Sequence, residues 1–155
     1  MKPKQLGVVL LLLTVLACAS RSTPATDERT PATSGTAVLT VTVLGLKSED
    51  SEVVLALFGS AEDFKTRTNA VAAGRVLPSD GTAVWQVENL QPGTYAVAIY
   101  HDLNGNGELD RTTLGPPDEP YGFSNDARGT FGPPKFDKAA IEIGPANRAI
   151  EIKLR

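Results

Sequence analysis

The side chains best suited to bind a metal ion or a ligand fall in one acidic stretch, residues 101–125. It begins with the pattern Asp102-x-Asn104-x-Asn106-Gly107-x-x-Asp110. Oxygen-bearing side chains at loop positions one, three, five and nine, with glycine at six, wrap a backbone around a hard cation such as Ca²⁺. The backbone carbonyl at position seven adds a further oxygen. The sequence therefore predicts a calcium loop with the ligands Asp102, Asn104, Asn106, Glu108 and Asp110.

The pattern also has an ordinary interpretation. Position twelve, which carries a bidentate acid in a helix-loop-helix calcium site, is Thr113 here, and a strand pattern precedes the loop. An EF-hand is therefore not expected, although Asp118 or Glu119 could complete the coordination shell. Asn-Gly and Asp-rich segments also form β-turns, because Asn and Gly tolerate positive φ. Both interpretations predict an ordered acidic loop.

The rest of the stretch offers either a binding surface or a plug. About thirty residues without periodicity are uncommon in a compact domain unless they are functional or pack on themselves. A binding surface would use His101, Asp118, Glu119, Tyr121, Phe123, Ser124 and Asn125. A plug would instead insert Tyr121, Phe123, Phe131 and Phe136 into the end of the domain.

Catalysis is the weaker interpretation of these residues. His101 is the single histidine and adjoins Asp102, so it could be a general base oriented by a carboxylate. Neighbours on a strand point to opposite faces, however, and such a histidine is more often a satisfied polar residue. The sequence has no second histidine, nucleophile elbow or phosphate loop. We therefore predict no catalytic residue and favour a non-enzymatic binding or accessory module. The alternatives are a metal-dependent or His/Asp-dependent periplasmic enzyme and a purely structural envelope lipoprotein.

The elements that position these residues are short strands. Apolar residues alternate with polar ones in most segments, which is typical of half-buried strands. The expected strands span residues 39–43, 52–58, 71–77, 82–87 and 95–100, with a closing hairpin of 138–143 and 149–154. One helical turn is expected at residues 61–65, capped by Ser60. About seven strands and no long amphipathic helix predict an all-β fold, an antiparallel immunoglobulin-like or transthyretin-like β-sandwich with one long loop.

The N-terminus predicts export and a lipid anchor. Lys2 and Lys4 precede the apolar run 6–16, so residues 1–17 fit a secretory signal peptide. Val15-Leu16-Ala17-Cys18 resembles the bacterial lipobox, in which cleavage leaves the cysteine lipidated; a cut nearby that discards Cys18 is the alternative. Residues 18–36 are expected to be a disordered tether of the single domain 37–155. Ala19 replaces the inner-membrane retention Asp, which favours the outer membrane.

Composition restricts the partners. The formal charge is −3, and no basic patch suggests nucleic acid binding. With one cysteine, no internal disulfide can form. The expected partners are the membrane, through the N-terminal lipid, and a glycan or an envelope protein, through the loop. Neither the ligand nor the oligomeric state follows from the sequence.

Three segments carry a family resemblance. The runs GTYAVAIYHDLNGNGELD, LGPPDEPYGFSND and PPKFDKAAIEI closely resemble a family of secreted bacterial proteins known only as a domain of unknown function, the DUF 2141 family. The resemblance covers nearly all of the expected domain. It implies the β-sandwich and one continuous site loop, residues 102–125, but it implies no activity.

Overall fold

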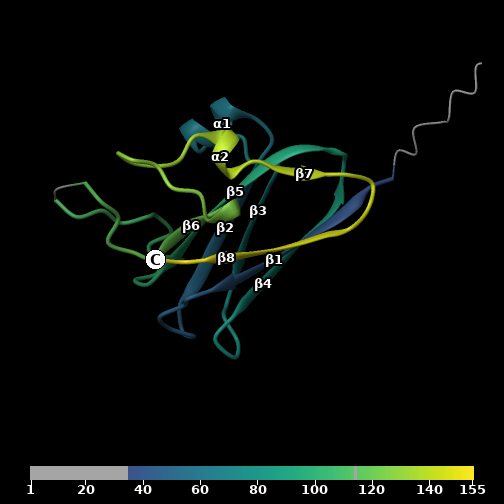
Figure 1. The fold of residues 1–155 in the computed structure, drawn as a ribbon. Coiled ribbons are helices and arrows are strands. Elements are labelled where there is room, and N and C mark those ends of the chain that lie inside the picture. The colour runs from purple at the N-terminus through teal and green to yellow at the C-terminus, as the bar shows by residue number, and fades with distance from the viewer. Residues whose placement is uncertain (1–34, 114) are drawn as a thin grey trace, which may run out of the picture. The chain divides into compact units, whose positions relative to one another are not determined.

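Two β-sheets packed face to face form the fold of the computed structural model, which describes residues 35–113 and 115–155 (Figure 1). The predicted signal peptide and Cys18 lie outside the described residues, as does nearly all of the predicted tether. One sheet has the strand order β4-β1-β8; the other has the order β3-β2-β5-β6, with β7 paired to β5. The strands are β1 (Ala37–Leu44), β2 (Glu52–Phe58), β3 (Ala72–Val76), β4 (Ala83–Leu90), β5 (Gly93–Asp102), β6 (Tyr121–Phe123), β7 (Ile141–Ile143) and β8 (Arg148–Lys153).

The core between the sheets confirms the predicted alternation. Leu39, Val41 and Val43 of β1 are fully buried, and Thr40 and Thr42 between them are partly exposed. The same alternation buries Val53, Leu55 and Leu57 on β2, and Ala83, Trp85 and Val87 on β4. The predicted turn before β5 is fixed by the Tyr95 hydroxyl, which donates a 2.9 Å hydrogen bond to the Gln91 carbonyl. The sequence therefore predicted the all-β sandwich correctly.

A second apolar cluster covers part of the outer face of the larger sheet. It contains Phe58, Phe64, Ala96, Phe123 and Ala139. Phe64 comes from α1 (Ala61–Thr66), where the predicted cap is present: the Ser60 hydroxyl accepts a 3.1 Å hydrogen bond from the Asp63 amide. Ala139 comes from α2 (Phe136–Ala139). Among the described residues, no helix has the length and apolar character needed to cross a membrane.

The expected closing hairpin is wrong. β7 pairs antiparallel with β5, whereas β8 pairs in parallel with β1, so the two strands join different sheets. Residues 144–147 therefore cross between sheets rather than forming a hairpin turn. The Asn147 side chain accepts a 3.0 Å hydrogen bond from the Val38 amide, which holds the crossing beside the start of β1. The described residues contain eight strands, and the β1–β8 pair departs from the expected antiparallel pattern.

The expected long unstructured stretch is partly ordered by pairing. β6 pairs with β5, with Tyr100 opposite Tyr121 and Ala98 opposite Phe123, and η1 (Ser124–Asp126) follows it. The central residue of β6 is Gly122, because the packing of the two sheets leaves no room for a side chain there. A Cβ at Gly122 would lie 2.9 Å from Cγ2 of Ile152 in the facing sheet. Glycine hides the period-two signal of this strand from sequence inspection.

Candidate functional site

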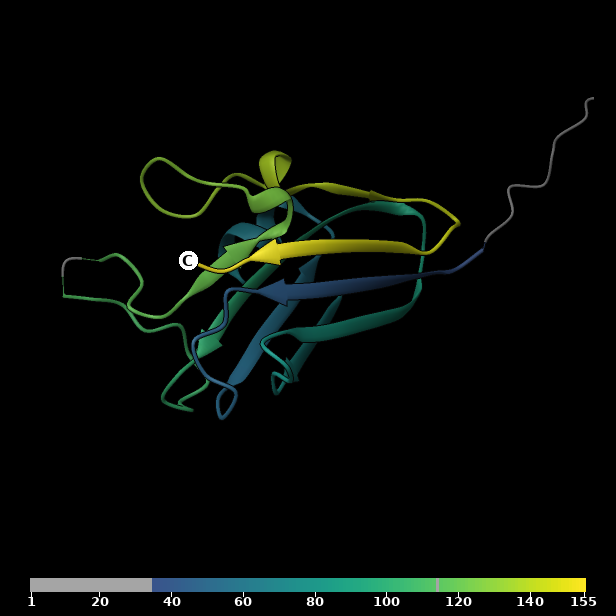
Figure 2. The same cartoon turned by 60° about the horizontal axis from the view of Figure 1, so that its bottom comes forward.

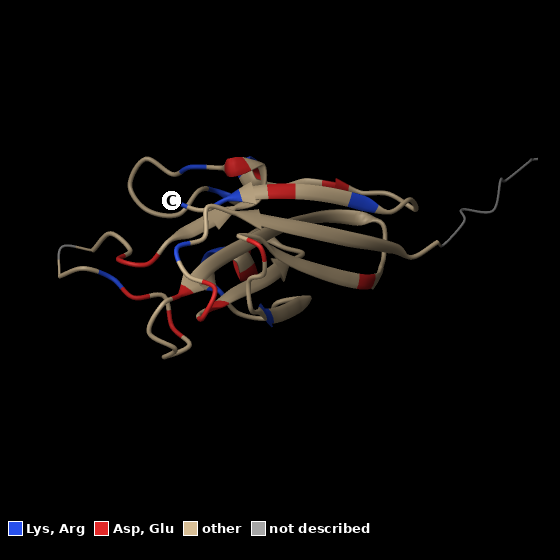
Figure 3. Cartoon of the chain, turned by 90° about the horizontal axis from the view of Figure 1, so that it is seen from below, with Lys and Arg blue, Asp and Glu red and all other residues tan. Residues whose placement is uncertain are grey.

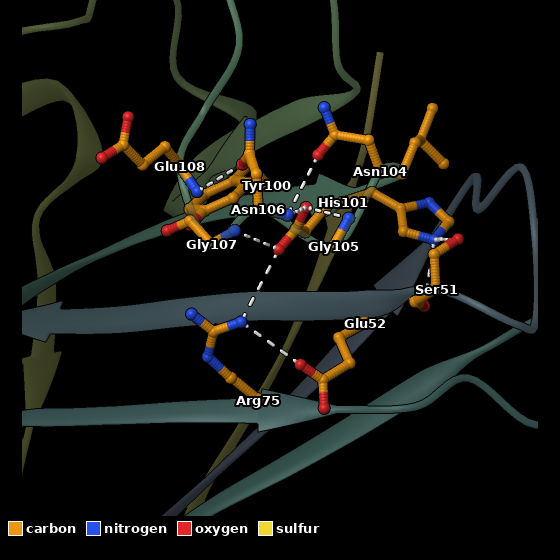
Figure 4. A network of polar contacts seen from close by, with 12 residues as sticks. Ser51, Glu52, Arg75, Tyr100, His101, Asn104, Gly105, Asn106, Gly107 and Glu108 are labelled. Carbon is orange, nitrogen blue, oxygen red and sulfur yellow. Dashed lines mark hydrogen bonds and ion pairs between the residues drawn. The ribbon is translucent and has the colours of Figure 1, made fainter.

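The loop between β5 and β6 wraps around one buried carboxylate. We call residues 102–119 the acidic loop; Figure 3 shows Asp and Glu residues gathered at the end of the domain that carries it. Asp102 is only 1% exposed. Its Oδ1 accepts hydrogen bonds from the amides of Gly105 (2.8 Å) and Asn106 (3.1 Å), and its Oδ2 accepts one from Gly107 (2.8 Å) (Figure 4). The carboxylate thus fixes the turn of the loop.

A second buried carboxylate closes the loop. Glu119 is 5% exposed, and its two oxygens accept hydrogen bonds from the amides of Leu103 (2.8 Å) and Asp110 (3.2 Å). It therefore joins both ends of the calcium motif. Asp118 beside it is exposed, and its amide donates to the Asp110 carbonyl at 2.9 Å. Asp118 and Glu119, the two acids that could complete a coordination shell, thus both lie next to the motif. The buried Glu119 already accepts two hydrogen bonds.

Three further motif side chains converge. The Asn104 and Asn106 carboxamides both contact the Asp110 carboxylate, at 2.5 Å and 3.1 Å. The Glu108 side chain is exposed and takes no part in these contacts. No group of three or more His, Cys, Asp and Glu side chains among the described residues could hold a metal ion. The motif instead offers two carboxylates and two carboxamides, and oxygen donors of this mixture are those that Ca²⁺ accepts.

Arg75 is a member of the site that sequence reasoning missed. This β3 residue places its guanidinium 3.2 Å from Glu52 Oε2 and 3.6 Å from Asp102 Oδ2. A Cβ at Gly107, where φ is +81°, would lie 2.8 Å from Arg75 Nη2. Glycine therefore allows both the turn and the close approach of the arginine. No local pattern marks Arg75, because strand register brings it to the loop.

Tyr100 joins the loop to the sheet. Its hydroxyl donates a 2.6 Å hydrogen bond to the Gly107 carbonyl. Burial raises the pKa of the Tyr100 hydroxyl above its usual value, and the nearby Asp102 carboxylate raises this pKa further. The neutral hydroxyl is therefore the form that supports the loop.

His101 points to the opposite face of β5 from Asp102 and contacts the loop between β1 and β2. It is fully buried. Its Nδ1 lies 3.4 Å from the Lys47 amide. Its Nε2 lies 3.2 Å from both the hydroxyl and the carbonyl of Ser51 (Figure 4). Strand alternation separates the ring from the neighbouring Asp102 side chain. The structure does not assemble the two residues into a dyad.

A groove of about 1040 Å³ lies over the outer face of the larger sheet. Its floor contains residues 54–56 and 58 of β2 and residues 98–100 of β5, together with Tyr121 and Phe123 of β6. The acidic loop and a second loop, residues 127–135, project from the same end of the domain (Figure 2) and contribute the walls. The wall residues are Gly107, Glu108, Leu109, Arg111, Gly115, Pro116, Pro117, Gly129, Thr130, Phe131, Gly132 and Pro133.

The groove contains two arginines that sequence reasoning also missed. The Arg67 guanidinium lies over the rings of Phe64, Phe123 and Phe58, with its central carbon 4.3, 5.2 and 5.7 Å from their centroids. Burial of the charged group and, to a lesser extent, the charge of Arg111 together lower the pKa of Arg67 to about 10. Arg111 Nη1 donates a 3.2 Å hydrogen bond to the Gly115 carbonyl.

The other candidate ligand residues divide between groove and scaffold. Tyr121 and Phe123 line the groove. Ser124 is fully buried; its hydroxyl accepts from the Val97 amide at 2.9 Å and donates to the Ala139 carbonyl. Asn125 is exposed and donates to the Ala140 carbonyl at 2.7 Å. The expected plug is wrong for Phe131, which is fully exposed, because its loop turns away from the second apolar cluster.

Comparisons with known proteins give a family but no activity. Neither the search of curated proteins nor the search of solved structures finds a match. The model of a family described as "Uncharacterized protein conserved in bacteria (DUF2141)" matches residues 41–151. This match covers most of the sandwich, the acidic loop and the groove, and the chain therefore belongs to the DUF2141 family.

Proposed function

We propose that the protein is a non-enzymatic binding module of the bacterial envelope, whose groove holds a ligand and whose acidic loop is stabilised by Ca²⁺. One observation carries this proposal. Residues 107–109 belong to the calcium motif and also line the groove. An ion that fixes the backbone of this segment would also fix a wall of the groove. Calcium binding and ligand binding would then be coupled through the same three residues.

The donor set supports calcium over a purely structural turn. Asp102, Asn104, Asn106 and Asp110 supply side-chain oxygens within one short loop, and the Glu108 carbonyl is the predicted fifth donor. Extracellular calcium modules bind with dissociation constants of about 10⁻⁴ to 10⁻³ M, so about 1 mM Ca²⁺ would stabilise the fold by about 0.5 to 1.5 kcal/mol. The ion would have a structural role and would perform no chemistry.

The groove supports binding better than acid-base catalysis. His101 is buried among loop residues 47–51 and is absent from the groove lining. The groove residues are mostly apolar, with a few charged groups, which is the usual character of a ligand site. The glycan or envelope protein expected from the sequence would instead bind through the acidic loop.

The N-terminal sequence supports a location in the envelope, which lipid labelling tests. A signal peptide ending at Ala17 would leave Cys18 as the lipidated N-terminus, which anchors the domain to the outer membrane. In bacteria that express the full chain, Cys18→Ala should abolish incorporation of labelled palmitate. Incorporation that persists in this variant would contradict a lipid anchor at Cys18.

Calorimetric titration tests the calcium proposal. Both apolar clusters consist of residues from Ala37 onward, so a chain of residues 35–155 keeps the described core. After chelator treatment, this chain should bind one Ca²⁺, and Asp110→Asn should weaken binding by about tenfold or more because it removes a ligand charge. Glu108→Gln is the matched control, since only the backbone of residue 108 is a predicted ligand. Absence of heat, together with the same melting temperature in calcium and in chelator, would contradict the proposal.

A further inference from the structure

Arg67 occupies an unusual place for an arginine. It ends α1 with φ +60° and ψ +35°, a left-handed conformation that usually selects glycine or asparagine. A non-glycine residue keeps this strained backbone conformation only where the surrounding structure holds it, so the contacts of the Arg67 side chain are informative. Here the side chain lies over three aromatic rings at the edge of the groove. Among residues 35–113 and 115–155, no side-chain hydrogen bond or ion pair uses its guanidinium.

Arg111 brings a second positive charge to the same groove. Its charge lowers the pKa of Arg67, so the two guanidinium groups repel one another across the site. Among the described residues, no acid of the acidic loop forms an ion pair with Arg67 or Arg111. Asp102 faces Arg75, Glu119 accepts backbone amides and Asp110 faces two asparagines, while Asp118 lies outside the groove lining. Glu108 is the only carboxylate among the groove-lining residues.

The remaining surface of the groove is apolar. The floor exposes the aliphatic residues Val54, Ala56 and Ala98 beside the ring of Tyr121. Phe131, fully exposed on the second loop, offers a further ring at the rim. A volume of about 1040 Å³ exceeds what an inorganic ion would fill and lies at the upper limit of small-molecule sites.

We propose that the groove binds a small, soluble organic anion, with its anionic head at Arg67 and Arg111 and its apolar body on the sheet floor. This inference rests on the proposed function and names its ligand class. Guanidinium groups bind carboxylates and phosphates through paired, charge-assisted hydrogen bonds. A bound anion would also remove the repulsion between the two arginines. The aromatic rings under Arg67 would hold its guanidinium in place for this contact.

Two fluorescent probes with the same rings test this proposal. 1-Anilinonaphthalene-8-sulfonate carries an anionic group, and N-phenyl-1-naphthylamine is its neutral counterpart. Titrated into the chain of residues 35–155 with Ca²⁺ present, the anionic probe should bind more tightly, at one site. Arg67→Gln and Arg111→Gln should each weaken it by about tenfold, since a charge-assisted hydrogen bond is lost. The neutral probe should keep its affinity, which also shows that each variant folds.

Arg148→Gln is the matched control, because Arg148 lies on β8, outside the groove lining, and donates to the Glu142 carbonyl. It should leave both affinities unchanged. Displacement of the anionic probe by decanoate or by decyl phosphate, but not by decanol, would support the proposal and identify the head group. Binding only to vesicles of anionic lipid, without displacement by these soluble anions, would overturn it.

Two further results separate this proposal from the proposed function. Equal affinities for the two probes, unaffected by the arginine substitutions, would overturn the anion preference but leave the groove a ligand site. Binding of neither probe would overturn both the anion preference and the groove as a site for such ligands, while the calorimetric result for calcium would stand independently.

Discussion

Asp102 determines the shape of the acidic loop at the level of a single residue. Its buried carboxylate accepts three backbone amides and faces the Arg75 guanidinium. Hydrogen bonds to a charged acceptor are stronger than neutral ones, and a buried partner left unpaired is costly. The loop therefore depends on this side chain even when calcium is absent.

Asp102→Asn should lower the free energy of unfolding by about 2 to 4 kcal/mol, because the amide nitrogen would face a backbone donor and the ion pair would be lost. Glu52→Gln is the control: Glu52 contacts the same arginine, but its side chain is 45% exposed. It should cost about 1 kcal/mol or less. Urea unfolding in chelator, followed by the fluorescence of the single tryptophan, measures both. Equal losses in the two variants would contradict the central role of Asp102.

The calcium motif could be predicted from the sequence, whereas the place of Arg75 beside it could not. The spacing from Asp102 to Asp110 lies within one loop, so a single sequence displays it. Arg75 reaches the loop because β3 and β5 both pair with β2, where Val54 is opposite Arg75 and Tyr100. Such register is a property of the assembled sheet, and no local periodicity records it. Arg67 and Arg111 were missed because only the folded chain brings the end of α1 and the acidic loop to the same groove.

At the level of elements, β3 and β4 depend on a glycine beneath the tryptophan. A Cβ at Gly74 would lie 2.9 Å from Cδ1 and 3.0 Å from Cε2 of Trp85, and would overlap Nε1. Trp85 is 9% exposed and belongs to the core between the sheets. The indole therefore packs directly on the β3 backbone, and β3 has no room for a larger residue here.

Gly74→Ala should lower the free energy of unfolding by about 1 to 3 kcal/mol, because either β3 or the indole must shift. Gly144→Ala provides the control, since a Cβ there meets no atom within 4 Å. It should change stability by about 0.5 kcal/mol or less. Urea unfolding and the emission maximum of Trp85 report the two effects. A Gly74→Ala variant as stable as the wild type would show that β3 does not pack on the indole.

The period-two pattern predicted the long strands well but failed where strands change partners. β1, β2 and β4 bury alternate residues over most of their length, so their sequences carry the signal, whereas β5 also buries consecutive residues at its two ends. β7 and β8 also alternate, and Gly144 and Pro145 between them are typical of a turn. Alternation shows which face of a strand is buried and does not show which strand lies beside it. The choice of β1 as the partner of β8 depends on contacts distant in sequence.

At the level of the whole molecule, the C-terminus joins the two sheets beside the groove. β8 belongs to the smaller sheet, and the Leu154 amide continues its pairing by donating to the Leu44 carbonyl at 2.8 Å. The next residue contacts the larger sheet: the amides of Arg155 and Tyr121 each donate to the other's carbonyl at 3.2 Å. The last residues therefore support β6, which supplies Tyr121 and Phe123 to the groove floor.

Removal of Leu154 and Arg155 should loosen β6 while leaving the sandwich folded. Leu154 is 4% exposed, and loss of its burial should cost about 2 to 3 kcal/mol. The β1–β8 pairing through Ile152 would remain. Hydrogen exchange should show lost protection of the Tyr121 amide and retained protection in β1. In full-length Arg155→Ala the backbone bonds persist, so Tyr121 should stay protected. Equal protection of Tyr121 in the truncated chain would show that β6 is held by β5 alone, and the C-terminus would then have no part in shaping the groove.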